Sequence, residues 1–131
     1  MTNSPQHQAQ SSPDIWVTAM RVAADRRSLA VDFTLNDQPE THELSAEYLR
    51  VESPSAEVQG HGPGQKRLVS GKADITIKTM DPVGHYAVRI GFADGHASGL
   101  YTWSGLYDLA QAYKTKWAAY CAALEQAGLS R

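Results

Sequence analysis

The segment from His85 to Trp103, HYAVRIGFADGHASGLYTW, constrains the fold most because it has the pattern of a complete β-hairpin. Apolar residues alternate with other residues on both sides of the Asp94-Gly95 pair, as in half-buried strands. Asp-Gly favours a two-residue turn whose central residues both have positive φ. That turn places Val88 opposite Tyr101. The predicted core face then carries Tyr86, Val88, Ile90, Phe92, Ala97, Gly99, Tyr101 and Trp103.

The flanking sequence predicts further antiparallel strands. Leu29, Val31, Phe33 and Leu35 alternate with smaller or polar residues between turn-forming segments, which indicates a strand. The same reasoning predicts one more strand within residues 73–84, with Ile75, Ile77 and Thr79 on one face. Together with the hairpin, these segments predict a mainly antiparallel sheet of five to six strands. The first three strands are expected near 15–22, 28–35 and 40–44.

Two helices complete the expected fold. Ser45 is a suitable N-cap for a short helix over 46–51. Apolar residues recur at three- and four-residue steps between Ser104 and Gly128, which predicts an amphipathic C-terminal helix that begins after Ser104 and ends at Gly128. This helix is expected to pack on the sheet, so the predicted class is α+β.

Length and composition indicate one domain and argue against several kinds of partner. The chain has 131 residues, with a polar segment over 1–13 that predicts a disordered tail and a folded domain over 14–131. A net charge of -2 argues against nucleic acid or an anionic membrane surface as a partner. The single cysteine, Cys121, favours a reducing, cytoplasmic setting. We expect a monomer or a weak dimer.

No complete catalytic motif occurs, so the candidate residues are weighed one by one. His96 either forms local hydrogen bonds beside its turn, or acts as a metal ligand or general base; the predicted hairpin points it away from the face of Tyr101 and Trp103. His61 lies in a Gly- and Pro-rich loop that lacks the spacing of a phosphate-binding loop. Arg50 is suited to clamping a carboxylate or pinning that loop.

Several short runs in a fixed order resemble a known family. The runs are YLR, SPSAE, GHGPGQ, PVG, YAVRI and DGH, and they resemble the gamma-butyrobetaine hydroxylase-like N-terminal domain from about Ile15 to the end of the chain. The resemblance implies a domain that precedes the oxygenase domain of gamma-butyrobetaine and trimethyllysine hydroxylases. It also implies a domain that is fused to P-loop iron–sulfur assembly proteins, or that stands alone in bacteria.

The resemblance also implies a structural zinc ion, held in the hydroxylases by three cysteines and one histidine. The histidine corresponds to His96, and the cysteine positions correspond to Ser53, Ser55 and Val58. Hydroxyl and isopropyl groups do not replace thiolates as zinc ligands, so we do not expect this zinc site. We predict instead that hydrogen bonds from Ser53, Ser55 or Glu57 to His96 and Arg50 hold the loop.

These observations favour a non-enzymatic accessory or protein-interaction module without a cofactor. Its protein partner is unidentified, and the resemblance points towards iron–sulfur assembly or oxygenase proteins. The alternative is an iron- or zinc-binding protein that uses His96 and His61, with Glu52 and Glu57 as further oxygen donors. The residues expected to serve structure or interaction are Arg50, Asp94, Gly95, Tyr101 and Trp103.

Overall fold

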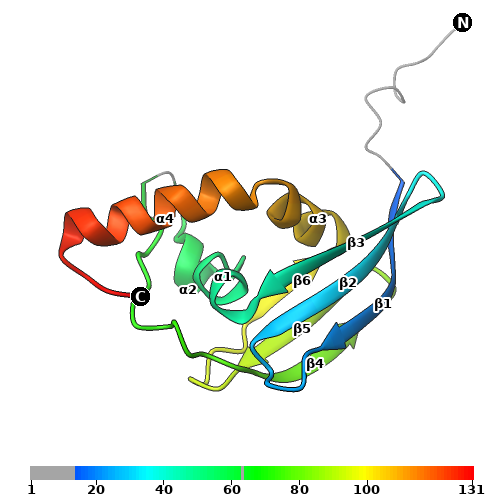
Figure 1. The fold of residues 1–131 in the computed structure, drawn as a ribbon, viewed down its shortest axis with the longest axis horizontal. Coiled ribbons are helices and arrows are strands. Elements are labelled where there is room, and N and C mark those ends of the chain that lie inside the picture. The colour runs from blue at the N-terminus through cyan, green and yellow to red at the C-terminus, as the bar shows by residue number, and fades with distance from the viewer. Residues whose placement is uncertain (1–13, 63) are drawn as a thin grey trace, which may run out of the picture.

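The computed structural model describes residues 14–62 and 64–131, and within them six strands form two antiparallel sheets of three strands each. The predicted tail lies outside the described residues. The first sheet has the order β1-β2-β3 and the second β4-β5-β6, and β4–β6 lie behind β1–β3 in Figure 1. The bounds of the strands are β1 Ile15–Val22, β2 Ser28–Leu35, β3 Gln38–Ser45, β4 Ile77–Val83, β5 Ala87–Phe92 and β6 Gly99–Thr102.

The expectation of one sheet was therefore wrong, although the α+β class and the antiparallel pairing were right. Periodicity predicts each strand and its hairpin neighbour, but it does not tell whether two meanders join edge to edge. Residues 46–76 separate them here and include two helices, α1 (Ala46–Val51) and α2 (Ala56–Gln59). The two sheets instead share one core with α1. Its fully buried members include Leu29, Val31, Phe33, Leu49, Val88, Ile90 and Phe92.

The first meander follows the predicted segments closely. Residues Asn36 and Asp37 have φ values of 52° and 68° and connect β2 to β3, so this pair forms the two-residue turn with positive φ at both positions. Ser45 then ends β3 and caps α1, because its hydroxyl accepts a hydrogen bond from the backbone N–H of Tyr48.

The register of the second hairpin is confirmed, but its tip is built differently. Val88 pairs with Tyr101, and the backbone N–H of Trp103 donates to the carbonyl of Tyr86. At the tip, Gly95 N–H donates to the carbonyl of Phe92, and Phe92 N–H to the carbonyl of His96. The pairing of Phe92 with His96 closes a loop of three residues rather than two, and within this loop only Gly95 has positive φ, +92°.

This longer tip changes which side chains face the core. One extra residue lies between His96 and β6, so Ala97 is exposed and His96 is buried, the reverse of the predicted arrangement. Tyr86 also lies outside the core, with 54% of its surface exposed. A similar irregularity between Ile77 and Thr79 in β4 leaves Thr79 exposed and packs Met80 against the core instead.

The C-terminal segment forms two helices rather than one. Helix α3 (Trp103–Gln111) begins at Thr102, whose hydroxyl accepts from Gly105 N–H, so Thr102 rather than Ser104 is the cap. The chain bends at Ala112 before α4 (Tyr113–Ala127), which ends at Gly128 as predicted. Figure 1 shows α3 and α4 above the sheets, with α1 and α2 beneath α4. No helix in the described part of the chain has the length and apolar character needed to cross a membrane.

Candidate functional site

Two segments that are distant in sequence meet beside the tip of the second hairpin. The first runs from the last turn of α1 into α2, and the second is the β5–β6 loop. Side chains of both segments form a network of hydrogen bonds and ion pairs that we call the polar clasp. It consists of Arg50, Ser53, Ser55, Glu57, Asp94, His96 and Ser98.

His96 lies at the centre of the polar clasp, and both of its ring nitrogens have partners. Nε2 is 2.9 Å from the Ser53 hydroxyl oxygen, and Nδ1 is 3.1 Å from Glu57 Oε1. A carboxylate only accepts, so Nδ1 carries the proton and Nε2 accepts from Ser53 in the neutral ring. Burial lowers the pKa of His96 and Arg50 lowers it further, while Glu57 and Asp94 offset part of the effect. The ring is therefore held in its neutral form.

Asp94 connects the hairpin tip to two cations. Its Oδ2 is 2.8 Å from Arg50 Nε and 2.7 Å from Lys72 Nζ, and its Oδ1 accepts from the backbone N–H of His96. Burial alone would raise the pKa of Asp94, but these three donors outweigh it and lower that pKa below its usual range. The carboxylate is thus ionised, and it fixes the tip of the hairpin to α1.

The two serines of the first segment complete the network. The Ser55 hydroxyl caps α2 by accepting from Glu57 N–H, and it lies 2.7 Å from the hydroxyl of Ser98. Ser98 also donates to Glu57. The close approach of Ser53 requires Gly99, because a Cβ at that position would lie 2.5 Å from the Ser53 hydroxyl.

The other predicted residues lie apart from the polar clasp. Glu52 is 7% exposed, and its Oε1 lies 2.6 Å from Lys66 Nζ and 3.7 Å from Lys116 Nζ. His61 is exposed, and its backbone N–H donates to the side chain of Gln65. The ring of His96 has Ser53 and Glu57 as its partners, and His61 is not one of them. The hydroxyl of Tyr101 donates to the carbonyl of Leu49, and the indole N–H of Trp103 donates to the carbonyl of His85.

The residues present do not fit the zinc ion that the resemblance implies. Ser53 and Ser55 use their hydroxyls in hydrogen bonds with other residues, and the side chain of Val58 is buried and apolar. None of the three supplies a thiolate, the ligand that zinc prefers in structural sites. In residues 14–62 and 64–131, no three His, Cys, Asp or Glu side chains are grouped so as to hold a metal.

Sequence reasoning missed three contributors to this region. Lys72 and Ser98 contact Asp94 and Glu57, and Gly99 leaves room for Ser53. No local pattern identifies Lys72 or Ser98, because each contacts a residue more than 20 positions away. Gly99 alone carried a signal, since glycine inside a strand often marks a close approach of another group.

The contacts of the polar clasp hold its two segments together. Its histidine is neutral and engaged at both nitrogens, and its carboxylates are paired. The buried groups of the polar clasp therefore contact one another, with the exception of Arg50 Nη1, which has no hydrogen-bond partner in the described part of the chain.

Comparisons with known proteins identify a matching family and similar solved structures. The family described as gamma-butyrobetaine hydroxylase-like, N-terminal, matches residues 20–107. A protein known from an NMR solution structure is 42% identical, with 98% of this chain and 90% of that chain covered and a TM-score of 0.75. A second NMR solution structure is 40% identical, covering 88% and 89% of the two chains, with a TM-score of 0.73.

A crystal structure extends the comparison. It is that of a protein of unknown function from Acidithiobacillus ferrooxidans, belonging to the DUF971 family; it is 34% identical, covers 72% of this chain and 92% of its own, and has a TM-score of 0.57. No curated protein gives a significant match.

Proposed function

Because the chain belongs to the gamma-butyrobetaine hydroxylase-like N-terminal family, we propose that it is a non-enzymatic accessory module that docks another protein. The observation that carries this proposal is a groove beside the polar clasp, between the α1–α2 segment, β6 and the α3–α4 pair. The groove has a volume of about 320 Å³. It is lined by Glu52, Pro54, Gln59, Leu100, Tyr101, Thr102, Gly105, Asp108, Leu109 and Lys116.

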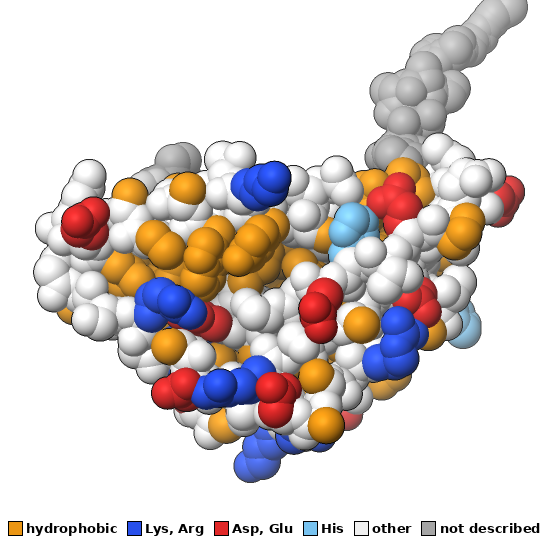
Figure 2. Space-filling view, in the orientation of Figure 1, with side chains coloured by type: hydrophobic (Ala, Val, Ile, Leu, Met, Phe, Trp, Pro, Cys, Tyr) orange, Lys and Arg blue, Asp and Glu red, His pale blue; other side chains and the backbone are white. Residues whose placement is uncertain are grey.

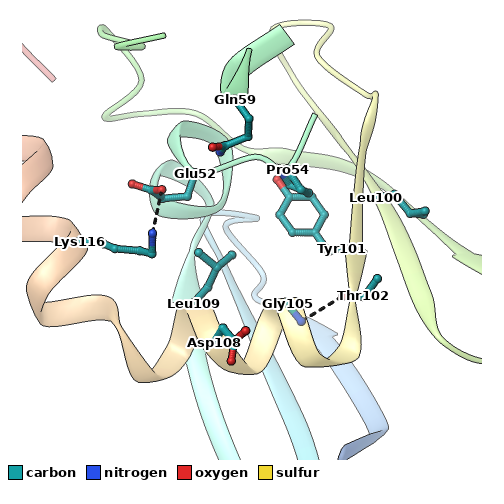
Figure 3. A pocket seen from close by; sticks show the side chains of 10 residues that line it. All are labelled: Glu52, Pro54, Gln59, Leu100, Tyr101, Thr102, Gly105, Asp108, Leu109 and Lys116. Carbon is teal, nitrogen blue, oxygen red and sulfur yellow. Dashed lines mark hydrogen bonds and ion pairs between the residues drawn. The ribbon is translucent and has the colours of Figure 1, made fainter. Parts of the chain in front are cut away.

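The groove combines an apolar floor with a charged rim. Figure 3 shows that the apolar side chains come from three elements, Pro54 from the α1–α2 segment, Tyr101 from β6 and Leu109 from α3. Glu52 and Lys116 face each other at one end. A second hollow of about 310 Å³ shares Glu52 and Lys116 and continues towards residues 66–69. An apolar centre surrounded by polar groups is the anatomy of protein interfaces.

The charges of the rim suggest the chemistry of the partner. Glu52 is already paired with two lysines, whereas the exposed carboxylate of Asp108 forms no ion pair within residues 14–62 and 64–131. We therefore favour a partner segment with an apolar side chain for the floor and a neighbouring basic side chain for Asp108. An iron–sulfur assembly protein or an oxygenase is the class of partner that the family suggests, by association alone.

The polar clasp supports this function by fixing one wall of the groove. Pro54 and Gln59 belong to the segment that His96, Asp94 and Ser98 hold in place. A wall that is already ordered before binding loses less conformational entropy when a partner docks. The clasp is thus the support of the binding surface, and it is not itself the contact.

The test compares proteins captured in the cells of origin by the wild-type chain and by Leu100→Glu, after chemical cross-linking. Leu100 lines the groove and is only partly buried, so the variant is expected to fold. The matched control is Leu129→Glu, an exposed leucine outside the groove, with 44% of its surface exposed. We expect a protein that the control retains and Leu100→Glu loses, and its binding by the purified chain to weaken at least tenfold.

Equal capture by the wild type and Leu100→Glu would contradict the groove as the docking site. Loss in both variants would also contradict it, because the effect would then not depend on the groove. Circular dichroism of each variant establishes that the fold is intact.

The metal-binding alternative has less support from the geometry. It requires His96 and His61 to act together, whereas the ring of His96 is engaged by Ser53 and Glu57 and His61 lies exposed in a loop. Elemental analysis of tag-free protein, purified without chelator, tests it. About one equivalent of iron or zinc, lost in His96→Ala, would favour the alternative over the docking module. Trace metal that does not change in His96→Ala supports the docking module.

A further inference from the structure

A further cavity, beside the α1–α2 segment, carries three basic residues in its lining. It has a volume of about 290 Å³ and lies between that segment and residues 67–72. Three of its lining side chains are basic, namely Arg50, Arg67 and Lys72, and Ser70 adds a hydroxyl. The single acidic residue among the lining residues is Glu57.

Arg50, which lines this cavity, carries an unused donor. Its Nε is committed to Asp94 at 2.8 Å. Its Nη1 is buried, and it is the one buried side-chain nitrogen or oxygen without a hydrogen-bond partner in residues 14–62 and 64–131. A buried guanidinium N–H without an acceptor is costly, so such an atom calls for a bound group that accepts from it.

The charges around the cavity do not cancel. Asp94 is shared between Arg50 and Lys72, and the carboxylate of Glu57 contacts His96 and Ser98. The side chain of Arg67 is exposed and makes no ion pair in the described part of the chain. Three cations, Arg50, Arg67 and Lys72, thus face two carboxylates, Glu57 and Asp94, which leaves one positive charge in excess.

We propose that this cavity binds a small oxyanion, a phosphate or carboxylate group, between Arg50 and Arg67. Guanidinium groups present N–H donors in a planar fork that matches both kinds of oxyanion. The ammonium of Lys72 adds charge, and the hydroxyl of Ser70 adds a donor. This cavity shares no lining residue with the docking groove itself, although it shares Arg67, Leu68 and Val69 with the hollow that continues the groove.

The test is a titration followed by NMR of the ¹⁵N-labelled chain, at constant ionic strength, with inorganic phosphate in one series and succinate in the other. We expect saturable shifts of the backbone amides of residues 67–72 and of the Arg50 Nε–H signal. Saturation by phosphate alone assigns a phosphate ligand, and saturation by succinate alone assigns a carboxylate. Saturation by either ligand, or by each of them, supports the site. Saturation by neither overturns it.

Arg67→Gln provides the decisive variant, because the side chain of Arg67 is exposed and forms no ion pair in the described part of the chain, so its change should not unfold the protein. Loss of a charged donor is expected to weaken binding at least about tenfold. The matched control is Arg89→Gln, which removes an exposed arginine of β5 outside the cavity and should leave binding unchanged. Equal binding by the wild type and Arg67→Gln, or equal weakening in Arg89→Gln, would overturn the proposal.

Discussion

Helix α1 and the residues that follow it are held to the second sheet in two contrasting ways. Within the helix, Tyr48 and Leu49 are fully buried in the apolar core. Immediately afterwards, Ser53 and Ser55 are also buried but are held by hydroxyl hydrogen bonds to His96 and Ser98. The apolar part gains stability from area removed from water, whereas the polar part depends on every donor finding its acceptor.

The contrast teaches which part of the chain tolerates a change of chemistry. Apolar packing accepts other side chains of similar volume with small losses. Removing one member of a buried polar network costs stability, because it leaves the hydrogen-bonding group of its partner unsatisfied. The polar clasp lies where the resemblance places a zinc ion in the hydroxylases, and here hydroxyl, imidazole and carboxylate groups connect the same two segments.

The largest effect is expected on the apolar side of this comparison. Leu49→Ala removes a side chain with 0% exposure from α1 and leaves a cavity in the core. We expect the free energy of unfolding to fall by about 2–5 kcal/mol. Urea denaturation followed by circular dichroism measures it. A loss no greater than that of an exposed leucine, such as Leu129→Ala, would show that α1 does not belong to the core.

The second-largest effect on stability is expected from changes in the polar clasp. His96→Ala leaves the buried hydroxyl of Ser53 without its partner, and we expect a loss of about 1–3 kcal/mol. The control His61→Ala changes an exposed histidine and should cost less than about 0.5 kcal/mol. Combining His96→Ala with Ser53→Ala should cost less than the sum of the two single losses. Strict additivity would show that the two residues do not act as one unit.

Low pH should weaken the polar clasp and so lower the stability of the unmutated protein. The pKa of His96 is lowered in the folded chain, so the unfolded chain takes up the proton first, near the ordinary value of about 6.5. Stability from the neutral ring is therefore present above this pH and is lost as the pH falls below it. Denaturation at pH 8 and pH 5 should show a drop in the wild type that is smaller in His96→Gln. Equal drops would mean that His96 is not the titrating group.

The smallest effect is expected at the exposed edge of the polar clasp. The side chain of Glu57 is 67% exposed, so water replaces its contacts readily. Glu57→Gln should change the free energy of unfolding by less than about 0.5 kcal/mol. It should nevertheless lower the pKa of His96, because Glu57 raises that pKa through its charge and hydrogen bond. NMR titration of the His96 ring measures the shift, and an unchanged pKa would refute the contact.

Much of the local structure was predictable because it depends on neighbours in the sequence. Alternating apolar residues set the first two strands and the pairing of Val88 with Tyr101. The hydroxyl of Ser45 and the flexible backbone of Gly128 set helix ends. The Asp94-Gly95 pair was correctly placed in a turn but given the wrong geometry, because Asp-Gly also suits a three-residue loop in which Gly95 alone has positive φ.

For the candidate site, the sequence predicted which residues take part but not how their side chains are oriented. The resemblance predicted that Ser53, Ser55 and His96 lie close together. It could not show that the extra residue after the turn rotates His96 inward, or that Glu52 turns away towards Lys66 and Lys116. The orientation of a side chain at the end of an element depends on one residue more or less in a loop, and periodicity does not resolve that difference.

The sequence by itself determined the class of the fold, most of its strands, the register of its second hairpin and the absence of the three thiolates at Ser53, Ser55 and Val58. The tertiary structure decided that there are two sheets, that the C-terminal helix breaks at Ala112 and that Arg50, Lys72 and Asp94 meet. The reason is physical. Local hydrogen bonds and alternation are encoded over a few residues, whereas charges and sheets that lie far apart in sequence are brought together only by burial of the shared core.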